Sequence, residues 1–431
     1  MAITKKGKRE KQKKELRKRV VDARTLSAED DDLDEYDDFL KETTFEEDMA
    51  EFEAAEKAIK KKKLSKLAKV LIIIGSIILL FCIWLFVERF IKYSSYSITS
   101  SSDSGTSGDK IEFFKDNLVK FSSSGIKYVN YDDEPIWEST ANLNNPVFSF
   151  SKNYGIIYDA DGTKVVVFDD ENVLAEFSVD YPISNARISD QGVSAISVKD
   201  GNSNFIWFFD NIGTKLEIEI KNVLADGSGY PLGLDISPSG VGVAMPLMII
   251  GGGSYKSCLT FYNFDKGKDS PNRIVGEFNY ERSVFPEIKY LSNSRAVAFG
   301  DNRICFYALS DATDPKLKNE IAYDNEIVSV STGEEKAAVV SKNSSGGYLL
   351  TVYNDNGKVI DEENFAFDFS KLEIVNGYVL IYGSGSALIE TTSGHLKYCG
   401  EMEGITISMI PISKGKFLQY GDYGTRTIRI P

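Results

Sequence analysis

A short sequence unit recurs about every forty residues through the C-terminal three quarters of the chain. Each copy combines an apolar strand, a tight polar turn and a second strand rich in small residues. The seven copies begin at Phe148, Ala186, Leu234, Ile288, Val328, Leu372 and Ile407. Repeats of this length are typical of solenoids and propellers, in which one unit cannot bury its apolar surface alone. The units must therefore stack on one another.

A second hairpin follows several of these copies. It combines a strand with an Asp, Asn or Gly turn, and examples begin at Val165, Trp207, Leu350 and Ala387. Gly supplies the positive φ that such turns need, and Asp and Asn hydrogen-bond their own backbone there. Two hairpins make a four-stranded sheet. The sequence therefore predicts an all-β chain over residues 110–431, folded as a β-propeller.

The number of blades depends on the two ends of the repeat region. The segment that begins at Ile111 resembles another copy, whereas the last unit, from Gly404, ends after three strands. We expect eight blades, and the alternative is seven, with the chain ends sharing one. An insertion from Met248 to Cys258 lengthens the fourth unit, and its glycines predict a mobile rim element.

An uncharged run of eighteen residues, 70–87, precedes the repeats. As an α-helix it would be about 27 Å long, close to the ~30 Å hydrocarbon core of a bilayer. We predict a transmembrane helix over residues 70–92, anchored in the lipid bilayer by Val70, Leu71, Trp84 and Val87. The alternative is a buried helix of a soluble protein, although such helices usually keep one polar face.

Lysines before this run predict its orientation. Six of them set the topology: Lys60, Lys61, Lys62, Lys63, Lys66 and Lys69. The other flank has few cations before Lys110. Because positive charge collects on the cytoplasmic side, we expect a single-pass protein of the cell membrane with a cytoplasmic N-terminus and an extracytoplasmic C-terminal domain.

Three further segments surround the apolar run. Residues 1–44 alternate basic and acidic blocks and predict a disordered cytoplasmic tail, whose acidic block from Glu29 to Asp38 is a possible docking site for a cytoplasmic partner. Residues 45–69 are rich in helix formers and predict a juxtamembrane helix. Residues 93–109 are mostly Ser and Thr and predict a flexible stalk.

Composition excludes several kinds of chemistry. Residues 94–431 carry 29 Lys and Arg against 45 Asp and Glu, so nucleic acid is not expected as a partner. A single His in the chain rules out His-based triads and most zinc sites. Cys258, Cys305 and Cys399 are expected as buried free thiols. We expect no cofactor, no metal and no catalytic residue, and we assign most aspartates at strand ends to turn capping.

The segments GIKYVNYDDEPIWE, GYPLGLDISPSG, FYNFDKG and VAFGDNRICFY resemble the ectodomain of a clostridial-type bacterial family of membrane-anchored proteins of unknown function. The resemblance implies an extracytoplasmic propeller on one membrane helix and brings no catalytic residues. The blades are also generically similar to quinoprotein-like and WD40-like repeats. Quinoprotein chemistry is not expected, because the chain lacks an adjacent cysteine pair and has only three tryptophans.

Three functions remain open. The first is a non-enzymatic interaction or scaffold module with a protein partner in the cell envelope. The second is a sensor that binds a small molecule or glycan at the mouth of the propeller channel. Aromatic and carboxylate side chains in the channel would favour it. The third is a hydrolase that uses two carboxylates in one cleft.

Overall fold

The computed structural model describes residues 43–102, 110–122, 125–131, 133–223, 227, 229–251 and 253–431. Contacts divide the chain into two compact units, Met1–Val87 and Glu88–Pro431. The predicted cytoplasmic tail, including its acidic block, lies outside the described residues except for its last two positions.

Helix α2 (Thr43–Phe90) covers the predicted juxtamembrane helix and the predicted span as far as Phe90, two residues before the predicted end at position 92. The side chains of Val70, Leu71, Trp84 and Val87 are each more than half exposed. Among the residues that the structure describes, no helix combines the length and the apolar character required for crossing a bilayer. The predicted span is therefore not confirmed.

The predicted topology-setting lysines all fall on α2. Lys69 is exposed. The side chains of the other five lysines lie outside the described part of the molecule: Lys60, Lys61, Lys62, Lys63 and Lys66.

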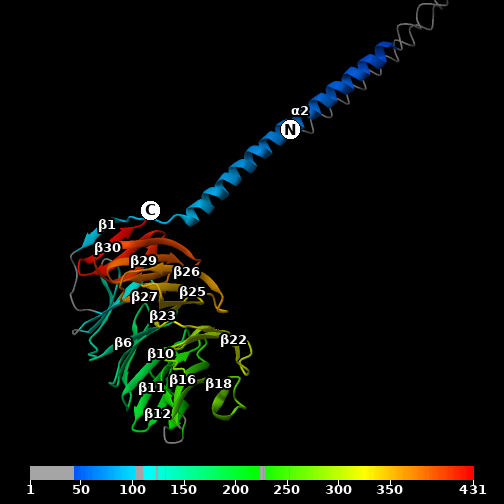
Figure 1. Cartoon of the computed structure of the whole chain (residues 1–431). Coiled ribbons are helices and arrows are strands. Elements are labelled where there is room, and N and C mark those ends of the chain that lie inside the picture. The colour runs from blue at the N-terminus through cyan, green and yellow to red at the C-terminus, as the bar shows by residue number, and fades with distance from the viewer. Residues whose placement is uncertain are drawn as a thin grey trace, which may run out of the picture. The chain divides into compact units, whose positions relative to one another are not determined.

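Six sheets of antiparallel strands follow one another along the second unit (Figure 1). The first sheet contains β2 (Lys110–Phe114), β3 (Asn117–Ser122), β4 (Gly125–Val129) and β5 (Pro135–Ser139). The second contains β6 (Pro146–Phe150), β7 (Gly155–Asp159), β8 (Lys164–Phe168) and β9 (Val173–Ser178). The third contains β10 (Ile183–Ile188), β11 (Ser194–Asp200), β12 (Ser203–Phe209) and β13 (Lys215–Val223). The fourth sheet contains β14 (Tyr230–Pro231), β15 (Asp235–Ile236), β16 (Gly242–Gly251), β17 (Ser254–Asn263) and β18 (Ile274–Glu281). The fifth contains β19 (Glu287–Ser292), β20 (Arg295–Phe299), β21 (Arg303–Ala308) and β22 (Lys316–Ala322). The sixth contains β23 (Ile327–Gly333), β24 (Lys336–Lys342), β25 (Tyr348–Tyr353) and β26 (Val359–Phe365). A short 3-10 helix, η2 (Pro271–Arg273), precedes β18.

The last sheet has seven strands in the order β1-β32-β31-β30-β29-β28-β27. Its members are β1 (Ser97–Ser102), β27 (Lys371–Val375), β28 (Tyr378–Tyr382), β29 (Ser384–Thr391), β30 (His395–Ser413), β31 (Lys416–Gly421) and β32 (Gly424–Arg429). The long strand β30 pairs with β29 as far as Ile405 and with β31 from Thr406 onward. One strand therefore ends one four-stranded group and begins the next.

Strand β1 lies within residues 93–109, where the sequence predicted a flexible stalk. It pairs antiparallel with β32, from Ser97 opposite Arg429 to Ser102 opposite Thr425. Without β1, the edge of β32 would present unpaired N–H and C=O groups. Backbone pairing needs no apolar side chain, so a run of serines can complete a sheet without the pattern that identifies other strands.

The predicted repeats are confirmed as hairpins, and β6–β7, β10–β11 and β19–β20 are examples. The segment predicted as a mobile rim element is instead a paired hairpin, because β16 and β17 pair in register as far as Gly251 opposite Ser254. Each is ten residues long, and the insertion therefore extends a hairpin.

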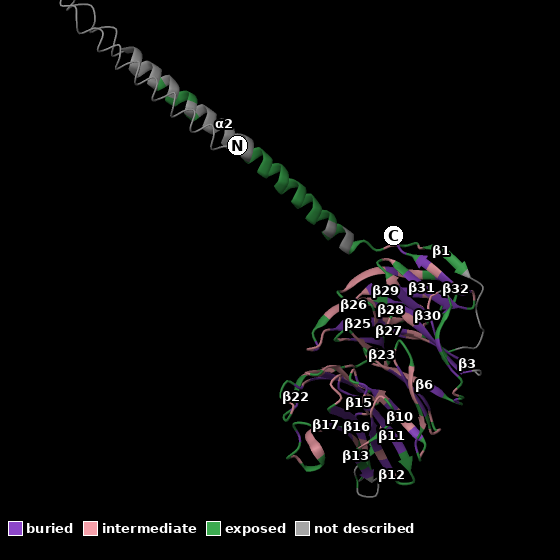
Figure 2. Ribbon diagram, turned by 180° about the vertical axis from the view of Figure 1, so that it is seen from behind, coloured by how far each residue is buried: buried purple, intermediate pink, exposed green. Residues whose placement is uncertain are grey.

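Buried apolar side chains lie between neighbouring sheets, where Figure 2 shows the buried residues of the strands. Ile156 of the second sheet and Ile196 of the third belong to one such cluster. The first strands of successive sheets line a common cavity. The second unit is therefore the predicted all-β propeller. The predicted eight blades stay a prediction, because the seven-stranded sheet can be counted as one blade or two.

The turn between β25 and β26 offers a test of the packing between blades. Gly357 has a φ of +75°, and a Cβ there would lie 2.5 Å from Cδ2 of Phe306 on the neighbouring sheet. Gly201 also has positive φ, at +56°, but nothing within 4 Å. We expect Gly357→Ala to lower the free energy of unfolding by about 3 kcal/mol, because backbone strain and a steric clash add. Gly201→Ala should cost about 1 kcal/mol from strain alone.

Urea denaturation of both variants measures this difference. Equal losses for the two glycines would show that the turn of Gly357 does not pack against the adjacent sheet as described.

Candidate functional site

The sheets of the second unit surround a cavity, which we call the central cavity. It has a volume of about 920 Å³ and is lined by residues of β2, β6, β7, β10, β15, β19, β23, β27 and β30. Most of these strands begin a group of antiparallel strands, whereas β15 is the second strand of a five-stranded sheet. The repeat itself therefore brings together residues from position 110 to position 407.

One position of the repeat supplies much of this lining. The second residue of five units faces the central cavity: Glu112, Ser149, Arg187, Asp235 and Lys289. Four of these five side chains carry a charge. Asp235 is one of the aspartates at strand ends for which the sequence predicted turn capping, and no role was predicted for the other four. The signal for this site is the recurrence of a polar residue between apolar ones on the first strand of each unit.

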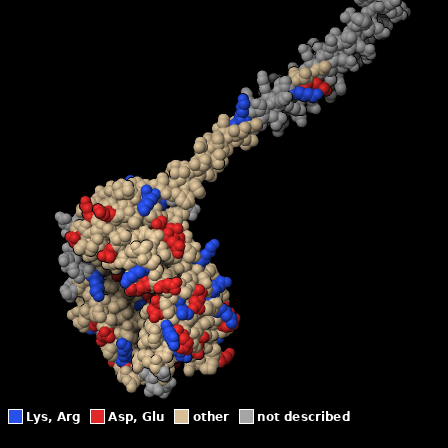
Figure 3. Space-filling model, in the orientation of Figure 1, with Lys and Arg blue, Asp and Glu red and all other residues tan. Residues whose placement is uncertain are grey.

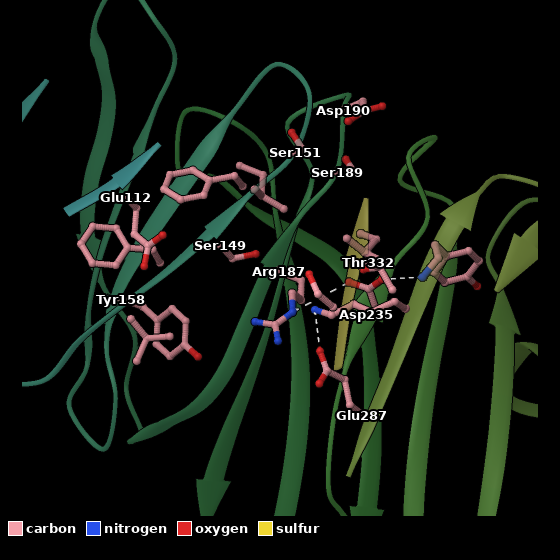
Figure 4. A pocket seen from close by; sticks show the side chains of 18 of the residues that line it. Glu112, Ser149, Ser151, Tyr158, Arg187, Ser189, Asp190, Asp235, Glu287 and Thr332 are labelled. Carbon is pink, nitrogen blue, oxygen red and sulfur yellow. Dashed lines mark hydrogen bonds and ion pairs between the residues drawn. The ribbon is translucent and has the colours of Figure 1, made fainter. Parts of the chain in front are cut away.

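A cluster of charged side chains occupies the wall formed by β10, β15 and β19 (Figure 4). Nε of Arg187 lies 3.8 Å from Oδ1 of Asp235, and the backbone N–H of Tyr290 donates to Oδ2 of that carboxylate at 2.7 Å. Nζ of Lys289 lies 3.6 Å from Oε1 of Glu287. Burial lowers the pKa of Lys289; the charge of Arg187 acts in the same direction, while the nearby carboxylates oppose it.

A second cluster lies where β2 meets β27. Nζ of Lys371 bridges two carboxylates, 3.0 Å from Oε2 of Glu112 and 2.6 Å from Oε1 of Glu373. The hydroxyl of Tyr382 donates to Oε2 of Glu373 at 2.6 Å. Burial raises the pKa of Glu112, and the ammonium of Lys371 partly offsets this effect. Burial alone would lower the pKa of Lys371, but Glu373 and Glu112 outweigh it, and the pKa is raised.

The central cavity also has apolar surface. Phe148 and Phe150 of β6 are half-buried at its wall, with ring centroids 6.1 Å apart and an interplanar angle of 27°. In Figure 4 the hydroxyl of Tyr158 and the guanidinium of Arg187 point toward one another across open space. Donors, acceptors and aromatic faces therefore meet in one concave site, which is typical of a small-molecule site. Within the described residues, no group of three or more His, Cys, Asp or Glu side chains could hold a metal ion.

The carboxyl group with the most strongly raised pKa lies elsewhere. Glu390 on β29 is fully buried, and neither of its oxygens has a hydrogen-bond donor among the described residues. Its pKa is raised to about 8, chiefly by burial and in addition by the neighbouring carboxylates of Asp361 and Glu363 on β26. A substrate cannot reach a side chain with no exposed surface. Glu390 is therefore a buried neutral acid and cannot serve as a catalytic acid.

Two of the aspartates assigned to turns have that role, whereas others, such as Asp190 and Asp301, accept backbone N–H bonds from distant segments. Oδ1 of Asp169 accepts backbone N–H bonds from Glu171 and Asn172, and Oδ1 of Asp210 accepts them from Ile212 and Thr214. The cysteines are free as predicted. Cys258 and Cys305 are buried, Cys399 is half-buried, and Cys82 on α2 is exposed.

A second surface feature lies at the tip of the extended β16–β17 hairpin. Ile250 is 63% exposed there, and Tyr255 and Tyr230 are 40% and 47% exposed. Met248 and Val284 complete a shallow pocket of about 310 Å³ beside Ile250 and Tyr255. We call these five residues the rim patch. Apolar side chains gathered at a rim are typical of a contact surface.

The sequence matches the model of a family described as a family of unknown function, DUF5711, over residues 89–430. No curated protein sequence matches the chain. Among solved structures, Sqt1 from Chaetomium thermophilum is similar with a TM-score of 0.51 and 12% identity, over 78% of this chain and 98% of that one. BamB from Moraxella catarrhalis has a TM-score of 0.46 and 12% identity, over 78% of this chain and 99% of that one. The WD40 domain of Neurospora crassa Pan2 has a TM-score of 0.39 and 9% identity, over 67% of this chain and 88% of that one. At such identities the likeness concerns the fold alone.

The pKa of Glu390 predicts how stability changes with pH. Because the folded-state pKa is raised above the ordinary carboxyl value, the folded state holds an extra proton between about pH 4.5 and pH 8. Stability should therefore fall as the pH rises through this window. The variant Glu390→Gln cannot ionise, so its melting temperature should change less between about pH 6 and pH 9 and exceed that of the wild type at the upper end.

Glu326→Gln is the matched control, because Glu326 is 64% exposed in its ion pair with Lys342 and should contribute little. Parallel pH profiles for the wild type and Glu390→Gln would contradict the assignment of a neutral buried acid.

Proposed function

The chain belongs to DUF5711, a family of unknown function, and from that premise we propose that it is a membrane-anchored extracytoplasmic β-propeller and serves as a non-enzymatic protein-interaction or scaffold module. Its place would be the bacterial cell envelope, in the clostridial-type cells that the sequence resemblance implies. Family membership brings no activity with it. The proposal therefore rests on the exposed surfaces and charges of this chain.

The rim patch is the observation that carries this proposal. Ile250 and Tyr255 lie beyond the length of the corresponding hairpins, on strands of ten residues where the two inner strands of the four-stranded sheets have five to seven. An apolar tip on an extended, fully paired hairpin gains nothing for folding, because it stays exposed to water. Large apolar and aromatic side chains are the usual anchors of protein interfaces.

Membrane anchoring is supported by the apolar run of α2. Residues 70–87 contain no charged residue, and Figure 3 shows a length of the helix with neither acidic nor basic side chains. The lysines before residue 70 favour a cytoplasmic N-terminus. The acidic block of the tail would then be available to a cytoplasmic partner.

We also propose that the protein has no enzymatic activity. Three of the four carboxylates that line the central cavity are paired with Arg187, Lys289 and Lys371, and Glu390 is inaccessible. A paired carboxylate is a poor proton donor or nucleophile. We also infer eight blades, counting β30 in two of them and β1 as the outer strand of the last.

A second function is favoured by one observation. The central cavity is not filled by apolar side chains, and carboxylates and aromatic rings line it together. This is the arrangement expected of a sensor that binds a small molecule at the propeller channel. The two functions are compatible, because the rim patch and the central cavity have no lining residue in common.

Protease accessibility tests the proposed topology. Protease added to intact, wall-stripped cells should digest the β-propeller and leave the N-terminal tail intact, because the bilayer protects only the cytoplasmic side. Immunoblots against tags at the two ends measure this. Digestion of the tail with a protected propeller would contradict the proposal.

Site-specific photocrosslinking tests the rim patch. A photoreactive residue at position 250 should capture a specific envelope protein in cells, because this side chain sits in the proposed interface. The matched control is position 212, where Ile212 is 64% exposed, about the same as Ile250, but lies in the β12–β13 turn. Equal crosslinking patterns at both positions, or none at 250, would count against an interaction surface at the rim patch.

A further inference from the structure

We infer that the central cavity binds an uncharged, hydroxyl-rich ligand of the saccharide class. This inference deepens the second proposed function and depends on it. Three properties of the wall carry it: the balance of charge, the incomplete hydrogen bonding of the charged groups, and the aromatic surface beside them.

The lining carries equal numbers of opposite charges. Four cations, Lys110, Arg187, Lys289 and Lys371, face four carboxylates, Glu112, Asp190, Asp235 and Glu287. Three of these cations form ion pairs with three of these carboxylates, and a ligand with a net charge that entered one of the pairs would leave a charge uncompensated in a partly buried site. The net charge of −14 for the whole chain also repels anions at long range. An uncharged ligand avoids both costs.

The charged groups nevertheless have hydrogen-bonding capacity to spare. Nε of Arg187 is buried without an acceptor among the described residues, because Asp235 lies at 3.8 Å, beyond hydrogen-bond distance. Glu287 and Lys289 are similarly separated by 3.6 Å. Nε itself is buried, but the side chain of Arg187 as a whole is 20% exposed and lines the cavity, so a ligand oxygen can approach it there.

A hydroxyl group fits between such partners better than a carbonyl or an ammonium group does. It accepts a bond from Arg187 or Lys289 and at the same time donates one to Glu287 or Asp235. The carboxylates can only accept, and the cations can only donate. A ligand that carries several hydroxyl groups can therefore satisfy both members of each separated pair without changing the charge of the wall.

The aromatic side chains account for the remaining surface of such a ligand. Phe148 and Phe150 present a half-buried apolar wall next to Ser149, which lies on the same strand. The ring of a saccharide has faces of C–H groups that are apolar, between hydroxyl groups at its edge. Contact of these faces with the phenyl rings would remove apolar area from water. The cavity of about 920 Å³ is in the range of small-ligand sites.

Saturation-transfer NMR and calorimetry on the chain tests this inference with defined probes. The neutral trisaccharides are N-acetylchitotriose and cellotriose. The charged ones are the deacetylated chitosan trimer and trigalacturonate, and a capped triglycine is the neutral peptide probe. At least one neutral trisaccharide should bind, and the charged trimers should bind at least about tenfold more weakly, because each leaves a charge unpaired.

Two variants locate the binding. Arg187→Met should weaken binding of the neutral trisaccharide at least about tenfold, because a ligand hydroxyl loses its donor. Ser149→Phe, which fills the cavity without altering charge, should do the same and covers the case in which Arg187→Met fails to fold. Arg303→Met is the control: Arg303 pairs with Glu320 outside the cavity lining, and binding should change less than about twofold.

Three results would overturn the inference: tighter binding of a charged trimer, equal binding of the capped peptide, or no binding of either neutral trisaccharide. These outcomes are separable from those for the rim patch. Crosslinking at position 250 without saccharide binding would leave the interaction module standing and remove the receptor. Saccharide binding without crosslinking would support the receptor and count against the interaction module.

Discussion

The structure depends on one constraint: a small sheet that is apolar on both faces has to be covered on both. Strand β7 shows this residue by residue. Ile156 and Tyr158 pack with the third sheet, whereas Ile157 between them packs with the first. Because side chains alternate across a strand, each sheet joins two separate clusters, and the cores are shared between neighbours. Sheets related in this way continue until they meet again, and a cavity is left at the centre.

That constraint explains why much of the fold could be predicted from sequence. Burial on both faces produces short, almost continuous apolar runs such as Lys164–Phe168, and glycine turns such as the one at Gly213 separate them. The turns recur because the sheet of every unit has the same short strands and is buried on both faces. Strand β1 does not follow this pattern, since Ser97–Ser102 is largely exposed and contributes backbone pairing and the side-chain hydrogen bonds of Ser97 and Thr99 to carbonyls of β32. Nothing in SITSSS distinguishes it from a linker.

The candidate site was harder to predict, because its partners are far apart in the chain. Glu112 and Lys371 form an ion pair across 259 positions, and Arg187 meets Asp235 from another sheet. Each is a lone polar residue in an apolar strand, and alone it looks like an ordinary surface position. Aligning the repeats would have placed Glu112, Arg187 and Lys289 at one equivalent position. Their pairing, however, follows only from the closure of the ring.

The pairing of β1 with β32 has a consequence for biosynthesis. Thr99 and Thr427, which hydrogen-bond across this pair, are 328 positions apart, so β1 leaves the ribosome long before its partner does. Until β32 is made, β1 has no partner, and the first and last groups of strands cannot join. A nascent chain that lacks β32 would therefore be an open arc with bare edges, exposed to misassembly and proteolysis. Synthesis of β32 is thus the step that allows the domain to close.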